Sequence, residues 1–162
     1  MLYINYNIKL MGYKYGLWYI YNYDEFPTKH IGHFTVTCFM ELESAKNLYN
    51  EIVTKIGKYN TINIICNEPI KFEMNMYEDD NNNLGSWGYR GIVNNWNELE
   101  FITKNYKCNF SHIPHTSIQY EKDEDKLWLQ RQDNKVVECE LFIVNICSDN
   151  PSDWYLVRSD FK

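Results

Sequence analysis

Two segments of the chain repeat one arrangement of residues that could carry acid–base chemistry. The first reads HIGHFTVTCF over 30–39 and the second reads HIPHTSIQY over 112–120. Each contains a histidine, a second histidine three residues later, and a hydroxyl residue two positions after that. A histidine can accept or donate a proton near neutral pH, and a hydroxyl can hydrogen-bond an anion. The repeat therefore predicts a site that transfers protons on an anionic group.

The residues after the second histidine of each segment alternate between polar and apolar types, which predicts a strand. Side chains at i and i+2 of a strand point to the same side, so His33 shares a side with Thr35, and His115 shares a side with Ser117 and Gln119. Two such imidazole–hydroxyl pairs brought face to face would hold one tetrahedral anion. One imidazole could then deprotonate the attacking oxygen while the other protonates the leaving oxygen, which requires no metal.

The elements that must position these pairs follow from the rest of the pattern. A helix is expected after the first motif strand, because apolar residues recur there at helical spacing, and a second helix is expected before the second motif. The order indicates one α+β domain over 1–162, built as two similar lobes that each supply one motif. The predicted strands are 16–23, 33–40, 61–66, 70–78, 87–93, 115–120, 135–147 and 153–161, and the predicted helices are 43–58 and a segment from Asn94 or Asn95 to about 106.

Composition limits the partners and the compartment. The 162 residues suit one domain, and 44% hydrophobic content supports a substantial core. The net charge of −6 disfavours long duplex nucleic acid, whose binding depends on many cationic contacts. Five cysteines form no CxxC pair, which argues against a disulfide framework and a thiolate zinc site. Without a signal-peptide pattern or a long apolar run, we expect a cytoplasmic monomer with no membrane partner.

The two motifs resemble the signature of a known enzyme family. His33-Phe34-Thr35 and His115-Thr116-Ser117 are similar to the paired H-x-T/S motifs of the 2H phosphoesterase superfamily, the LigT-like phosphodiesterases. The helices and the terminal strands fit as well, so the resemblance spans nearly the whole chain. It implies a two-lobed, pseudo-duplicated fold in which antiparallel sheets line a central cleft with the helices outside. It also implies that His33 and His115 share base and acid duties, that Thr35 and Ser117 bind phosphate oxygens, and that no metal or other cofactor takes part.

The resemblance also suggests a substrate class. Family members cleave 2′,3′-cyclic phosphates at RNA ends, 2′,5′-linked oligoadenylates and cyclic dinucleotides, and viral relatives remove antiviral messengers in this way. The acidic surface and the 17% aromatic content favour a small nucleotide over long RNA. Trp18 and Tyr19 fall on alternate sides of the first strand, so only one can face the site. Tyr19, Trp87 and Arg90 are the candidate substrate contacts.

Two other readings of the histidines stay open. His30 with His33, and His112 with His115, form two H-x-x-H pairs that could hold zinc through four imidazoles. That arrangement would leave the two hydroxyls without a role, so we expect His30 and His112 to lie in loops with no part in the chemistry. The chain could also be a noncatalytic module that only binds a nucleotide.

Overall fold

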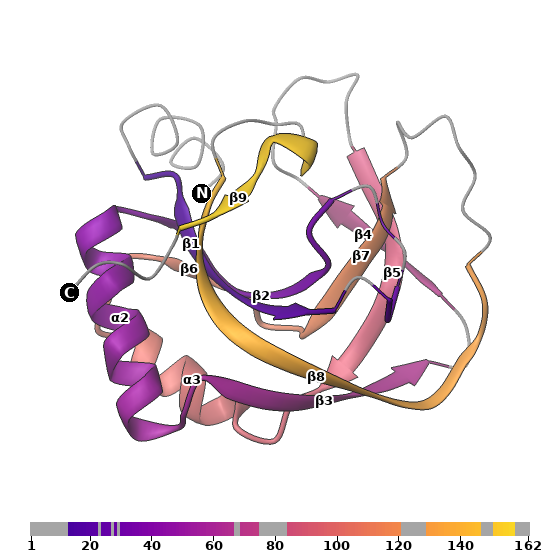
Figure 1. Ribbon diagram of the computed structural model, residues 1–162, viewed down its shortest axis with the longest axis horizontal. Coiled ribbons are helices and arrows are strands. Elements are labelled where there is room, and N and C mark those ends of the chain that lie inside the picture. The colour runs from indigo at the N-terminus through magenta and orange to yellow at the C-terminus, as the bar shows by residue number, and fades with distance from the viewer. Residues whose placement is uncertain are drawn as a thin grey trace.

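The structure is a computed structural model that describes residues 13–22, 24–26, 28, 30–66, 69–74, 84–120, 129–146 and 151–157. Within these ranges the fold is α+β, with one curled antiparallel sheet of nine strands and two α-helices (Figure 1). The strands are β1 (Tyr15–Tyr21), β2 (His33–Met40), β3 (Tyr59–Cys66), β4 (Ile70–Met74), β5 (Leu84–Ile92), β6 (Asn109–Phe110), β7 (His115–Tyr120), β8 (Gln132–Asn145) and β9 (Tyr155–Leu156), and the helices are α2 (Leu42–Lys55) and α3 (Trp96–Thr103).

The strand order places the two motif strands in different parts of the sheet. It runs β4-β5-β3-β8-β1-β2-β6, with β7 paired to β5 and β9 paired to β8. The first motif strand, β2, is thus held by β1 and β6, and the second, β7, is held by β5. Figure 1 shows the long strand β8 as an arc that passes from β3 to the region of β1 and β9. The predicted pseudo-duplication of two lobes stays a prediction, although each motif strand does belong to its own ladder.

Local chemistry explains where α2 ends, but not where α3 begins. Helix α2 ends at Lys55, three residues before the predicted end, and Gly57 follows with a φ of 109°. The Gly57 N–H donates to the carbonyl of Ile52 at 3.1 Å, which is how a left-handed glycine closes a helix. Asn95 stands at the cap position of α3, but its side chain makes no capping hydrogen bond.

The C-terminal segment departs from the prediction of a strand over 153–161. A short 3₁₀ turn over Pro151–Asp153 precedes the two-residue strand β9, and residues 158–161 lie outside the described residues. Asp153 belongs to this turn and is therefore not part of a strand, and β9 begins two residues later at Tyr155. The predicted strand 70–78 is described only as far as Met74.

Each side of β1 packs into a different apolar cluster. Leu17, Tyr19 and Tyr21 face the large core, which also contains the buried side of both helices. Trp18 faces the opposite side and joins a small cluster with Trp154 and neighbouring residues of β8. Burying an apolar side chain of this size contributes about 1.5–3 kcal/mol, so the large core anchors β1 and its neighbours. No helix of the described ranges is both long enough and apolar enough to cross a membrane.

Candidate active site

The two motif histidines have the same place and the same hydrogen bond. His33 begins β2 and His115 begins β7. The Nδ1 atom of His33 lies 2.6 Å from the carbonyl oxygen of Ile31, and the Nδ1 atom of His115 lies 2.8 Å from that of Ile113. A carbonyl oxygen can only accept, so Nδ1 carries the proton in both rings and Nε2 carries the lone pair in the neutral ring. Both imidazoles are therefore arranged to act as bases through the same atom.

Strands β2 and β7 lie next to each other, but no strand pairing joins them in the described part of the chain. Side chains from β1 and from the segment before β2 contact β7 instead. The Tyr21 hydroxyl lies 2.6 Å from Oγ1 of Thr116, and Nε2 of His30 lies 3.0 Å from the carbonyl oxygen of Ser117. Contacts from the β1–β2 region thus hold the second motif strand through the Thr116 side chain and the Ser117 backbone.

His33 lies in a pocket of aromatic rings. Its imidazole stacks on Trp18 with 3.5 Å between centroids and 7° between planes, while Trp154 meets it edge-on at 6.1 Å. The pKa of His33 is lowered from 6.5 to about 3, chiefly by burial; the hydrogen bond to Ile31 opposes the shift, and charge repulsion from the rings of His30 and His115 adds to it. His33 is therefore neutral at physiological pH in the unliganded protein, and a charge on it is coupled to the state of His115.

His115 is less enclosed than His33. It is half-buried, and burial is the main cause that lowers its pKa below 6.5. The guanidinium of Arg90 lowers the pKa further, because two positive charges repel. Arg90 is the direct partner of His115 across the β5–β7 ladder, so a cation stands beside this histidine.

The two motif hydroxyls differ in their surroundings. Ser117 is buried, and its Oγ lies 2.8 Å from Oγ of Ser86, a fully buried serine on β5. Thr35 is half-buried and lies opposite Trp18 across the β1–β2 ladder. Each hydroxyl is two residues after its histidine and on the same side of its strand, as the motif spacing predicts.

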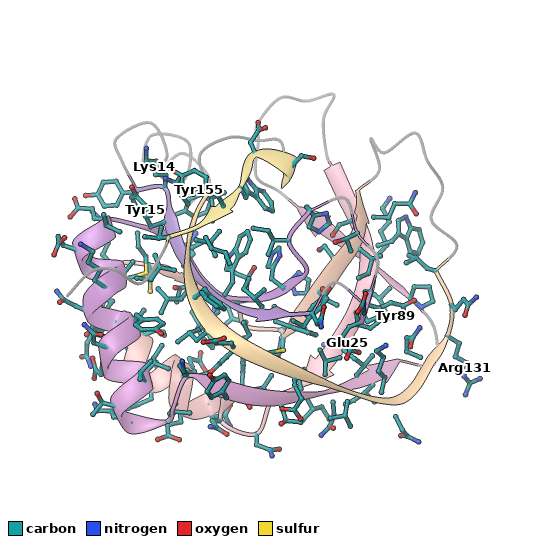
Figure 2. The ribbon with its side chains drawn as sticks, viewed as in Figure 1. Lys14, Tyr15, Glu25, Tyr89, Arg131 and Tyr155 are labelled. Atoms are coloured by element: carbon teal, nitrogen blue, oxygen red, sulfur yellow. The ribbon has the colours of Figure 1, made fainter. Side chains whose placement is uncertain are left out.

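The register of β5 and β7 decides which neighbours can reach His115. Arg90 pairs with His115 and Gly88 pairs with the motif serine, so these residues share the histidine side of the ladder. Trp87 and Tyr89 alternate with them and lie on the other side. Tyr89 stacks there on Phe26, near Glu25 in Figure 2. Of the two candidate contacts on β5, the structure brings Arg90 to the histidine and does not bring Trp87.

An irregularity in β7 also changes the place of Gln119. Ser117 pairs with Gly88 and Gln119 pairs with Trp87, so Ile118 has no partner in the ladder. The extra residue is a β-bulge, which moves every later side chain to the opposite side. The expectation that Gln119 lies beside Ser117 is therefore wrong.

On β1 the structure brings Trp18 to His33 and does not bring Tyr19. Tyr19 is fully buried in the large core, where burial raises the pKa of its hydroxyl and Asn60 lies close to it. Strand alternation requires one of the two aromatics to face the core, and the ring of Trp18 is the one that stacks on the histidine.

The outer histidines of the two H-x-x-H pairs have different surroundings. His112 is 79% exposed and lies 3.4 Å from a carboxylate oxygen of Glu100. His30 is half-buried and lies in a loop, as expected, but the structure also brings it into contact with Ser117 of the second motif strand. In the part of the chain that the structure describes, no three His, Cys, Asp or Glu residues are arranged to hold a metal ion. The four imidazoles thus do not form the zinc site considered from the sequence.

Three residues that had no expected role in the site contact its motif residues: Ser86 contacts Ser117, Trp154 contacts His33, and His30 contacts both. Ser86 and Trp154 are distant in the chain from the residues they contact, and only the strand register and the C-terminal turn bring them there. His30 did carry a signal, since it repeats the position of His112, but the repeat does not say which copy contacts the site.

No family model, no curated protein and no solved structure matches this chain in comparisons with known proteins.

Proposed function

We propose that this protein is a metal-independent phosphodiesterase that cleaves a small nucleotide messenger by acid–base catalysis with His33 and His115. The observation that carries the proposal is that the two imidazoles have the same position in their strands and the same hydrogen bond. Each donates from Nδ1 to the carbonyl two residues earlier, and each lies two residues before a hydroxyl on the same side of its strand. Histidines that serve only packing have no reason to share all of these features. The resemblance of the motifs to those of 2H phosphoesterases supports the same chemistry.

The proposed reaction assigns one role to each of these groups. In a 2′,5′-linked nucleotide the free 3′ hydroxyl lies next to phosphorus. The Nε2 atom of one histidine takes the proton of the 3′ hydroxyl while the 3′ oxygen forms a bond to phosphorus. The second histidine donates a proton to the departing 5′ oxygen as the P–O5′ bond breaks. The products are a 2′,3′-cyclic phosphate and a 5′ hydroxyl. Thr35 and Ser117 hydrogen-bond the non-bridging oxygens, and Arg90 supplies positive charge beside them.

The charge of the molecule supports a small substrate. The net charge of −6 opposes the approach of a long polyanion, whereas one or two phosphates need only a few donors near Arg90. A 2′,5′-linked oligoadenylate or a cyclic dinucleotide such as cyclic GMP-AMP meets this requirement. An RNA end with a 2′,3′-cyclic phosphate is the second candidate, since the same two imidazoles could activate water and protonate the leaving 2′ or 3′ oxygen.

A substrate panel tests the proposal. The purified protein is incubated in EDTA with 2′,5′-linked and 3′,5′-linked triadenylate, with 2′,3′- and 3′,3′-linked cyclic GMP-AMP, and with a short RNA ending in a 2′,3′-cyclic phosphate. We expect cleavage only where a 2′,5′ linkage is present, with a cyclic phosphate as the first product seen by chromatography. Cleavage of the RNA end alone supports the second candidate. If nothing is cleaved, the enzymatic proposal fails, and nucleotide binding by calorimetry would identify a binding module.

The histidine pKa values predict an acidic pH optimum. Acid–base cleavage needs one protonated and one neutral imidazole, whereas burial holds the pKa of His33 at about 3 and that of His115 below 6.5 in the free protein. The doubly neutral form dominates at neutral pH, so kcat/KM rises as the pH falls and reaches its maximum below pH 6.5. A profile of kcat/KM from about pH 4 to about pH 8 checks this prediction. A maximum above neutrality would show that at least one of the two groups is a different residue.

A further inference from the structure

The proposed reaction does not use the first histidine of either repeated segment. His30 and His112 occupy the same position of the two H-I-x-H segments, three residues before His33 and His115. His112 points away to Glu100 and is mostly exposed. His30 instead reaches across to the second motif strand and lies edge-on to His33 at 6.1 Å. The two histidines therefore differ in their surroundings, and only His30 contacts the motif residues.

His30 holds the backbone of Ser117. Strand β7 pairs only with β5 among the described strands, so its other edge has no ladder partner there. At that edge the carbonyl oxygen of Ser117 lies 3.0 Å from Nε2 of His30. The carbonyl can only accept, so Nε2 of His30 carries the proton and donates. His30 is thus in the opposite tautomer to His33 or is protonated, and it acts as a hydrogen-bond donor where the motif histidines present a lone pair.

Ser86 holds the hydroxyl of the same residue. The two Oγ atoms are 2.8 Å apart, and Ser86 has no exposed surface. For Ser117 to donate its proton to a phosphate oxygen, its Oγ must accept the proton of Ser86. The Ser86 hydroxyl fixes the rotamer of Ser117 in this arrangement and polarises its O–H bond.

We propose that His30 and Ser86 are positioning residues that set Ser117 as a phosphate donor, His30 through the Ser117 carbonyl and Ser86 through the Ser117 hydroxyl. The inference rests on the proposed phosphodiesterase function. It assigns His30, which comes from the segment before β2, the task of fixing the distance between the two motif strands. It gives the repeated histidine a role that is neither acid–base catalysis nor metal binding.

The test compares His30→Ala, His30→Gln and Ser86→Ala with His112→Ala, the matched change at the exposed copy. The amide nitrogen of glutamine can lie where Nε2 of histidine lies, so His30→Gln keeps the donor. We expect His30→Ala and Ser86→Ala each to lower kcat/KM about tenfold or more, chiefly through KM. The kcat/KM of His30→Gln should lie within about threefold of the wild-type value. The kcat/KM of His112→Ala should equal the wild-type value. The pH profile should keep its position in Ser86→Ala and His112→Ala. In the two His30 variants both limbs of the profile should remain, with a small upward displacement, because the charge repulsion that His30 exerts on His33 is lost.

Three results would overturn the positioning role: equal kcat/KM for His30→Ala and His112→Ala, no recovery in His30→Gln, or the loss of one limb of the kcat/KM–pH profile in His30→Gln, which would make His30 a proton-transfer group. Nitrogen-15 NMR adds a readout that does not depend on turnover, since the His30 Nε2–H signal should be protected from exchange in the wild type. If the wild-type protein cleaves nothing on the panel, the proposed function fails. If the wild type is active and His30→Ala is unaffected, only the positioning role fails.

Discussion

His33→Asn and His115→Asn are each expected to lower the rate of phosphodiester cleavage by about 10²–10⁴-fold, the usual effect of losing one acid–base group. Asparagine is the informative replacement, because its amide nitrogen can still donate to the carbonyl oxygen that Nδ1 contacts, at Ile31 or Ile113. Only Nε2, the atom assigned to proton transfer, is lost. Initial rates in EDTA for the best substrate of the panel give the measurement.

The variants also separate catalysis from packing. His33 stacks on Trp18, so His33→Ala should cost stability as well as activity, whereas His33→Asn fills part of the space. The double variant His33→Asn with His115→Asn should be little slower than either single one, because the two groups act in one step. His112→Ala serves as the control with normal activity. Near wild-type rates for either Asn variant, with the fold intact by circular dichroism, would disprove the shared mechanism.

Gly88→Ala is expected to have the largest effect on stability, because the backbone of the neighbouring strand β7 lies very close to this glycine. A Cβ at position 88 would lie 1.8 Å from the carbonyl oxygen of Thr116 and 3.0 Å from Cα of Ser117. Both are backbone atoms and cannot turn aside, so β7 must separate from β5. We expect a loss of about 3 kcal/mol in the free energy of unfolding and, since His115 and Ser117 move with the strand, about a 10²-fold loss of activity.

A second glycine provides the control for Gly88→Ala. Gly57 has a φ of 109° with no atom within 4 Å of an added Cβ, so Gly57→Ala strains only its own backbone and should cost about 1–2 kcal/mol. It lies after α2, away from β7, and should leave the kcat of the folded protein unchanged. Urea unfolding and rates measured well below both melting temperatures separate the two effects. Wild-type stability in Gly88→Ala would show that β7 and β5 lie farther apart than the register indicates.

The elements around the histidines could be predicted because their patterns are local. Strand β2 has the predicted bounds 33–40, since polar and apolar residues alternate along it, and α2 follows because its apolar residues recur at helical spacing. The two-residue strand β6 could not be foreseen. Asn109 and Phe110 carry no strand pattern, and they pair only because Thr37 and Cys38 of β2 lie beside them.

The surroundings of the histidines were harder to predict than the motifs, for two physical reasons. Alternation places Trp18 and Tyr19 on opposite sides of β1, but it does not say which side meets the helices. The bulge at Ile118 leaves no mark in the sequence, yet it decides that Gln119 turns away from Ser117. The serine pair Ser86–Ser117 depends on cross-strand register, which arises only when the whole sheet forms.

The central claim, that His33 and His115 act on one phosphodiester, is tested most directly by NMR of the histidine rings during titration with an inert substrate analogue. A 2′,5′-linked diadenylate without the 3′ hydroxyls can bind but cannot be cleaved, because the attacking oxygen is missing. We predict that the Nε2 and Cε1 signals of His33 and His115 shift together and saturate at one equivalent, while those of His112 stay in place. Binding of the analogue that leaves either His33 or His115 unshifted would contradict a shared site.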